Sequence, residues 1–376
     1  MSATTAAALV QGRPGAARHH TLRRLPFLLP GGVALLAGLD AALMLIGLPA
    51  PVDLARLPEV HGMLLVLGFV GTLIALERAV ALSRPAGYLA PALLGAGGLL
   101  LVSPAPLWTG RSLLLSGAAA LTLLYVPLWR RQRDDAVLVQ ALGAVLAAGA
   151  AGLWLGGVTV AALLPWLVGF IVLTIAGERL ELARLAMGPG AGTRLVLLST
   201  AVVASVVASL LWPLTTPLLG VAVLGLVGWL GVHDVARRTV RSTGQVRFMA
   251  AGMLAGYAWL AVAATVWVVG GAATGGTAYD AVVHAVFLGF TMSMIMAHAP
   301  VILPAVLRSP MPYHPVLVGP AVLLHASLVL RLWVGDALGS ATAWQVGGAL
   351  NITALLAFVG VVVWLVVRSR RVGARR

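Results

Sequence analysis

The sequence predicts an all-α polytopic membrane protein with about twelve transmembrane helices. Sixty per cent of its 376 residues are hydrophobic and ten per cent are charged, whereas soluble domains carry about 25% charged residues. The mean hydropathy is +1.01. Continuous apolar runs rich in Leu, Ala, Val and Gly reach the ~20 residues that a membrane-spanning helix needs. They lack the alternation, in segments of ~10 residues, that is typical of a membrane barrel.

Short polar or basic turns divide these runs into the individual elements. All the expected helices belong to one transmembrane domain at residues 25–370, between a basic tail at 1–24 and a short tail at 371–376. In chain order we expect helices at 26–48, 61–83, 87–104, 110–129, 136–156, 158–185, 193–212, 216–233, 247–270, 279–306, 315–334 and 343–368.

The distribution of charge predicts the orientation of the helices. The net charge is +14, and the basic residues cluster in alternate loops such as Arg130-Arg131-Gln132-Arg133 and Arg237-Arg238. The other loops are mostly short and neutral. This bias predicts an even number of spans in a bacterial inner membrane, with both termini cytoplasmic. Lipid explains the basic charge without nucleic acid as a partner. The absence of cysteine excludes disulfides, thiolate metal sites and iron–sulfur clusters.

A Gly-Phe pair recurs on the second, sixth and tenth expected helices, each time with an ionisable residue eight positions after the Phe. A spacing of four helices with parallel copies predicts three pseudo-symmetric four-helix repeats, roughly 26–129, 136–233 and 247–368. The three copies are Gly68-Phe69 with Glu77, Gly169-Phe170 with Glu178, and Gly289-Phe290 with His298.

Two histidines open the second and tenth helices on the expected outer side. His61 and His284 are placed to be two axial ligands of one haem or two ligands of a copper ion. His61 shares a helix face with Gly68, so a flat ring is expected to approach the helix closely there. The alternative is a pair of interfacial histidines with hydrated rings.

A second candidate site lies near the expected cytoplasmic face. The repeat places Glu77, Glu178 and His298 at one depth, and His325 of the eleventh helix is expected at a similar depth. Carboxylates and imidazoles suit a divalent metal or a proton relay. The alternative for the glutamates is snorkelling with the arginines that follow them.

Other polar residues inside the spans receive simpler explanations. Asp40 and Arg331 both lie in the expected outer half, where they are placed to neutralise each other. Gln140 and Asn351 are expected to hydrogen-bond between helices. Asp234 falls in a cytoplasmic loop and is given no role.

Three short stretches carry a resemblance to a known family: Leu25-Pro26-Phe27-Leu28-Leu29, Glu59-Val60-His61-Gly62-Met63 with Gly68-Phe69, and His284-Ala285-Val286 through Met294. They resemble the NnrS family of twelve-span bacterial proteins, within the broader architecture of the heme-copper oxidase catalytic subunit. The resemblance implies a haem- and copper-containing membrane protein linked to nitric oxide, with His61 and His284 as outer ligands.

The sequence also departs from these families. The second helix has one histidine where the NnrS family has two, and the sixth and seventh helices have none. These departures argue against a complete oxygen- or nitric-oxide-reducing centre, and no catalytic residue is assigned. The first hypothesis is therefore a b-type haem or transition-metal protein that receives electrons from a separate donor or quinone. The alternatives are a proton- or metal-ion-coupled transporter or channel using Glu77, Glu178 and His298, and a structural subunit or sensor.

Overall fold

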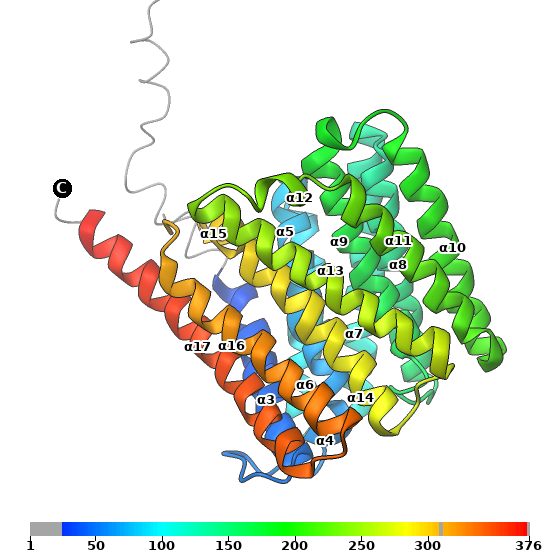
Figure 1. The fold of residues 1–376 in the computed structure, drawn as a ribbon, viewed down its shortest axis with the longest axis vertical. Coiled ribbons are helices and arrows are strands. Elements are labelled where there is room, and N and C mark those ends of the chain that lie inside the picture. Colours follow the sequence, from blue (N-terminus) through cyan, green and yellow to red (C-terminus); the bar gives the residue numbers. More distant parts are fainter. Residues whose placement is uncertain (1–24, 308–310, 374–376) are drawn as a thin grey trace, which may run out of the picture.

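The computed structural model describes residues 25–307 and 311–373, and the regular elements of this part of the chain are all helical (Figure 1). The first half contains α3 (Leu25–Leu45), α4 (Leu57–Met63), η1 (Leu64–Gly71), α5 (Thr72–Leu82), η2 (Pro85–Tyr88), α6 (Leu89–Val102), α7 (Leu107–Gln132), α8 (Asp135–Leu155), α9 (Leu164–Met187) and α10 (Ala191–Leu211). The second half contains η3 (Pro213–Thr215), α11 (Thr216–His233), α12 (Ala236–Thr239), α13 (Gly244–Gly270), α14 (Gly276–His284), η4 (Ala285–Met292), α15 (Ser293–Leu307), η5 (Pro315–Leu317), α16 (Val318–Val329), η6 (Leu330–Ala337) and α17 (Ala341–Gly373).

Each predicted span falls on a helix. Within the described residues, eleven continuous helices are long and apolar enough to cross a bilayer, as expected of a polytopic membrane protein. The other predicted span corresponds to α9, which carries charged residues in its second half. This helix starts at Leu164 and not at 158, because Pro165 occupies the first turn, where a missing N–H is tolerated. The two tails stay predictions: α17 continues to Gly373, and residues 1–24 lie outside the described residues.

Three helices form the centre of the bundle. In the helix Leu57–Leu82, which joins α4, η1 and α5, 72% of the most apolar stretch is buried, and in Gly276–Val306 the share is 67%. Most residues of α9 are buried too. These are the three helices with the Gly-Phe pairs. The first and last helices, α3 and α17, pack side by side at the periphery (Figure 1).

Two of the central helices share a local distortion. The π-helical segments η1 and η4 each span eight residues, and the Gly-Phe pair occupies the fifth and sixth positions of both. Hydroxyl groups bond to backbone carbonyls here: Thr72 donates to Gly68 at 2.7 Å, and Thr291 donates to Val286 at 2.9 Å. The α9 copy is continuous α-helix. A full threefold repeat therefore stays a prediction, while two copies share the same register within a π-helix.

The space beside Gly68 is filled by protein. A β-carbon added there would lie 3.2 Å from Cβ of Ala34 and 3.4 Å from Cα of Gly98. Gly68 thus allows α3 and α6 to approach the central helix, as small residues commonly do between membrane helices. The expectation that a flat ring lies against Gly68 is wrong. The physical reason is that its missing side chain serves helix packing.

The two ends of the bundle differ in charge. We call the end where α7 and α12 carry Arg130, Arg131, Arg237 and Arg238 the arginine-rich end. The opposite end contains α4, α14 and the loop between α3 and α4. Figure 1 shows α5, α12 and α15 near one end of the bundle and α4 and α14 near the other.

Candidate functional site

A network of charged side chains lies toward the arginine-rich end of the central helices. Arg78 of α5 is buried at its centre, with a side chain 8% exposed. Its guanidinium lies 2.7 Å from Glu77, 3.1 Å from Glu181 and 3.9 Å from Glu178. Three carboxyl groups therefore surround one guanidinium.

An amide from a neighbouring helix completes this half of the network. Gln140 of α8 accepts a hydrogen bond from Arg78 at 3.1 Å and donates one to Glu181 at 3.1 Å. Gln140 is fully buried, so its amide needs both bonds. Its predicted role between helices is confirmed, and the bonds tie α8 to α5 and α9.

Arg179 is the centre of the other half of the network. Its Nε and Nη2 donate to the two carboxylate oxygens of Asp234, at 2.8 and 3.1 Å. Such bidentate pairs are strong because both bonds are charge-assisted. Nη1 of Arg179 donates to Nε2 of His298 at 3.2 Å. The alternative of pairing each glutamate with the arginine that follows it holds for Glu77 and Arg78. It is wrong for Arg179, which binds the buried carboxylate of Asp234 in place of Glu178.

Asp234 accepts two further hydrogen bonds. Tyr257 donates from its hydroxyl at 2.7 Å, and the backbone N–H of Ala236 donates at 2.9 Å. Burial by itself would raise the pKa of Asp234, but the bonds from Arg179, Ala236 and Tyr257 outweigh it and hold that pKa below its ordinary value. The side chain is therefore a fixed carboxylate that ties α9 to α13.

The predicted inner residues are brought together in part. Glu77 and Glu178 both approach Arg78, and His298 lies within electrostatic range of Glu77. His325 is elsewhere: its Nδ1 accepts from Trp259 at 3.0 Å, and its Nε2 lies 3.5 Å from Ser293. Within the described residues, no three His, Asp or Glu side chains meet closely enough to hold a metal ion. The structure therefore brings Glu77 and Glu178 to one guanidinium and places His325 apart from them.

The two outer histidines, His61 and His284, make similar hydrogen bonds. Nδ1 of His61 lies 2.9 Å from the carbonyl oxygen of Gly38, and Nδ1 of His284 lies 2.9 Å from the carbonyl oxygen of Asp280. A carbonyl only accepts, so each Nδ1 carries the proton and each Nε2 has a free lone pair. In the described part of the chain neither Nε2 has a hydrogen-bond partner, and the two rings lie within electrostatic range of each other.

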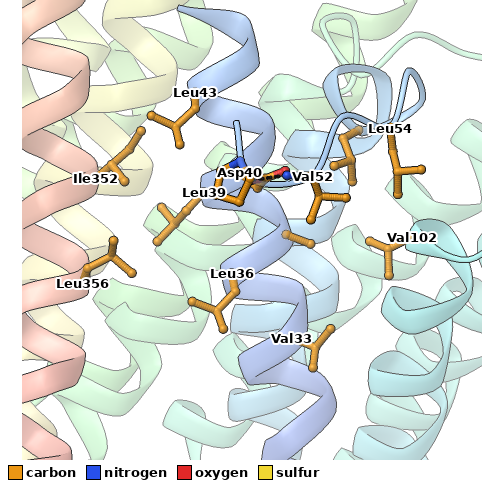
Figure 2. Close-up of a pocket in the computed structure, with 13 residues that line it drawn as sticks. Val33, Leu36, Leu39, Asp40, Leu43, Val52, Leu54, Val102, Ile352 and Leu356 are labelled. Carbon is orange, nitrogen blue, oxygen red and sulfur yellow. Dashed lines mark hydrogen bonds between the residues drawn. The ribbon is translucent and has the colours of Figure 1, made fainter. Parts of the chain in front are cut away.

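Arg331 belongs to this outer site. It makes two hydrogen bonds to Asp280, at 2.7 and 2.8 Å, and lies over the ring of Trp344. The carboxylate of Asp280 also lies 3.2 Å from Nδ1 of His284. The expected neutralisation of Asp40 by Arg331 is wrong, since Asp40 accepts from the backbone N–H of Val52 at 3.2 Å (Figure 2). Asp40 and Arg331 both lie in the expected outer half of the bundle, but their side chains face different neighbours.

The sequence reasoning missed several members of both sites. Asp234 is in a loop, as expected, but its side chain lies against α9 and α13. The sequence indicates one of its bonds, because an Asp commonly accepts from the backbone N–H two residues further on, here that of Ala236 at the start of α12. Asp280 also had a signal, because it lies one helical turn before His284. Tyr257 has no sequence signal that distinguishes it from a packing residue.

Comparisons with known proteins identify a family and no function. Residues 24–367 match a family described as a domain of unknown function (DUF8744). No curated protein and no solved structure matches the chain significantly. Since the match covers nearly the whole chain, including both candidate sites, the protein belongs to this family of domains of unknown function.

Proposed function

We propose that the protein is a membrane haem protein in which His61 and His284 bind the iron of one b-type haem. The observation that carries the proposal is that both imidazole rings are oriented in the same way. Both donate from Nδ1 to a carbonyl oxygen, which leaves both Nε2 lone pairs available to a metal. Metal-bound histidines are commonly oriented in this way. The resemblance to the NnrS family supports the same two residues.

The surroundings of the two rings fit such a role. The carboxylate of Asp280 beside His284 would raise the basicity of that ligand, while His61 is held by a neutral carbonyl. Arg331 would balance negative charge at the edge of the site. A haem held there supplies one-electron chemistry, with electrons from a separate donor or a quinol. The protein's own residues orient the two ligands through the carbonyl oxygens of Gly38 and Asp280.

Titration of hemin into the purified apo-protein tests this assignment. Wild type is expected to bind hemin saturably at one site, and either His61→Ala or His284→Ala should weaken binding at least tenfold. His325→Ala is the matched control, because it removes another intramembrane histidine that is engaged by Trp259 and Ser293. Equal binding by all four proteins would contradict the proposal.

A second candidate function has its own supporting observation. Three carboxyl groups meet one guanidinium at Arg78, so the cluster holds more carboxyl groups than cations. Ionisable groups inside a membrane bundle commonly relay protons, and a surplus of carboxyl groups favours proton uptake. The network toward His298 would then be a proton-handling site of a transporter or channel.

Proton flux into proteoliposomes under an applied potential tests the second candidate. Glu178→Gln should lower the flux severalfold, because it removes the carboxyl group that lies farthest from Arg78. Glu59→Gln is the matched control, since Glu59 pairs with Arg111 at the opposite end and is 57% exposed. Equal flux in Glu178→Gln and wild type would exclude the relay.

A further inference from the structure

One carboxyl group in the cluster around Arg78 lacks a hydrogen bond. Arg78 donates to Glu77 at 2.7 Å and to Glu181 at 3.1 Å. Glu181 also accepts from Gln140 at 3.1 Å. Glu178 lies 3.9 Å from the same guanidinium, which is beyond hydrogen-bonding distance, and no other donor among the described residues reaches it. Glu178 is therefore the carboxyl group that the cluster leaves unpaired.

A buried donor from a neighbouring helix is unpaired too. Tyr125 of α7 is 2% exposed, and its hydroxyl group has no hydrogen-bond partner in the part of the chain that the structure describes. This hydroxyl group lies within electrostatic range of Arg78 and of all three carboxyl groups, and among these carboxyl groups Glu178 acts on it most strongly. Buried hydroxyl groups are rarely left without a partner. The unpaired donor and the unpaired carboxyl group therefore belong to one site.

The space around the unpaired donors leaves no room for a bound molecule. The hydroxyl oxygen of Tyr125 is enclosed by protein, as is Nε of Arg78, which also lacks a partner among the described residues. A water molecule needs a cavity of at least its own size. In the same part of the chain, no three His, Asp or Glu side chains are arranged to hold a metal ion. A proton needs no cavity, because it binds directly to a carboxyl oxygen.

The charges around Glu178 favour a proton on this residue. The charged and titratable groups that face it are Glu77 and Arg78 of α5, Tyr125 of α7, and Arg179 and Glu181 of α9. Arg179 is matched by Asp234, and Arg78 by the two glutamates that accept from it. An ionised Glu178 would add an unmatched negative charge, and carboxyl groups that share a site do not all ionise together. Glu178 is also less exposed than Glu77 and Glu181, with side-chain exposures of 20%, 28% and 35%. The proton therefore belongs on Glu178, since water screens the charges of the other two better.

We propose that Glu178 is a proton-binding residue, and that the hydroxyl group of Tyr125 donates a hydrogen bond to it when it is ionised. A carboxylate is a stronger acceptor than a neutral acid, so loss of the proton attracts the unpaired hydroxyl group toward Glu178. In the structure the hydroxyl group does not reach Glu178, as expected for the protonated state. Proton release then ties α7 to α9. The inference rests on the same cluster as the second candidate function, but it requires proton binding and not proton flux.

Infrared spectroscopy of the purified full-length protein tests the proposal, because a protonated carboxyl group has a C=O stretching band that a carboxylate lacks. Spectra recorded over a pH series should show such a band for wild type in neutral buffer, and the band should disappear as the pH rises. Glu178→Gln should lack this band. Glu59→Gln is the matched control and should retain it, because Glu59 lies at the opposite end of the bundle and is 57% exposed. A wild-type spectrum without a band that depends on Glu178 would overturn the proposal.

Tyr125→Phe tests the hydrogen bond apart from the packing of the ring. It removes the donor that stabilises the ionised carboxylate, so Glu178 should hold its proton about tenfold more tightly, and the midpoint of the band should move to a higher pH by about one unit. Tyr88→Phe is the matched control, because Tyr88 packs against Phe27 outside the cluster. An unchanged midpoint in Tyr125→Phe would also overturn the proposal. A band that depends on Glu178, found without proton flux in proteoliposomes, would exclude the relay and support this inference, and hemin binding is independent of both.

Discussion

Arg179 and His298 are joined by a hydrogen bond of 3.2 Å between helices α9 and α15, across 119 residues of sequence. The guanidinium donates, so Nε2 of His298 accepts. Nδ1 of the same ring lies 2.9 Å from the carbonyl oxygen of Met294 and donates to it. Both ring nitrogens are thus engaged, and His298 is a neutral member of the network with no nitrogen left for a metal.

This arrangement predicts different effects for two substitutions of His298. His298→Leu removes the acceptor for Arg179 and leaves a buried N–H of the guanidinium unpaired, which should cost about 1–3 kcal/mol of folding free energy. His298→Gln retains a carbonyl acceptor of similar reach and should cost clearly less. Thermal unfolding of the detergent-purified variants measures the difference. Equal melting temperatures for His298→Leu and His298→Gln would show that the hydrogen bond from Arg179 does not contribute to stability.

The ion pair between Arg179 and Asp234 should matter far more than a surface pair. Their side chains are 6% and 0% exposed, and removing one partner of a buried pair costs about 3–5 kcal/mol. Asp234→Asn should therefore lower the melting temperature strongly. Asp134→Asn is the matched control, because Asp134 pairs with the half-exposed Arg184 and such pairs contribute about 0–1 kcal/mol. Similar shifts in both variants would contradict this assignment.

The same carboxylate predicts an acid dependence of stability. The pKa of Asp234 in the folded protein lies below its ordinary value, which is about 3.9 in an unfolded chain. Its stabilising contribution is therefore complete above that unfolded pKa and is lost as the pH falls toward the folded pKa. The difference in melting temperature between wild type and Asp234→Asn should therefore be smaller at pH 3 than at pH 7. A constant difference across this range would show that ionisation of Asp234 is not involved.

Close helix packing at Gly68 predicts a contrast between two glycines. Gly68→Ala places a methyl group 3.2 Å from Ala34 and 3.4 Å from Gly98, and overpacking of this kind costs about 1–3 kcal/mol. At Gly32 of α3 an added β-carbon meets nothing within 4 Å, so Gly32→Ala should be neutral or slightly stabilising. Unfolding of the two variants in the same detergent checks the contrast. A melting temperature of Gly68→Ala at or above that of Gly32→Ala would show that the two helices adjust without cost.

The helices were predictable from the sequence, because membrane spans need long apolar runs and short turns divide them. The exception at the start of α9 has a local cause in Pro165. The repeat also marks the central helices, since its Gly-Phe pairs lie on the three most buried helices. It did not predict the π-helical segments, because an inserted residue in a helix leaves no distinct hydropathy pattern.

The candidate sites were predictable only in part. The repeat predicted a common depth for Glu77, Glu178 and His298. All three lie in or beside the network of charged side chains around Arg78 and Arg179. Depth does not give the direction in which a side chain points, so the partners Asp40 and Arg331 were matched wrongly and His325 was placed with the wrong cluster. Asp234 was missed because charge in a loop normally faces water, whereas here the loop residue is covered by α9 and α13.

The optical spectrum of the reduced protein, purified from membranes of haem-supplied cells, tests the central claim most directly. Ligation by His61 and His284 predicts a Soret band with sharp α and β bands of a six-coordinate, low-spin haem. These bands should be lost in His61→Ala and in His284→Ala and retained in His325→Ala. A colourless wild-type preparation that remains folded would contradict the account, as would bands that survive both outer substitutions.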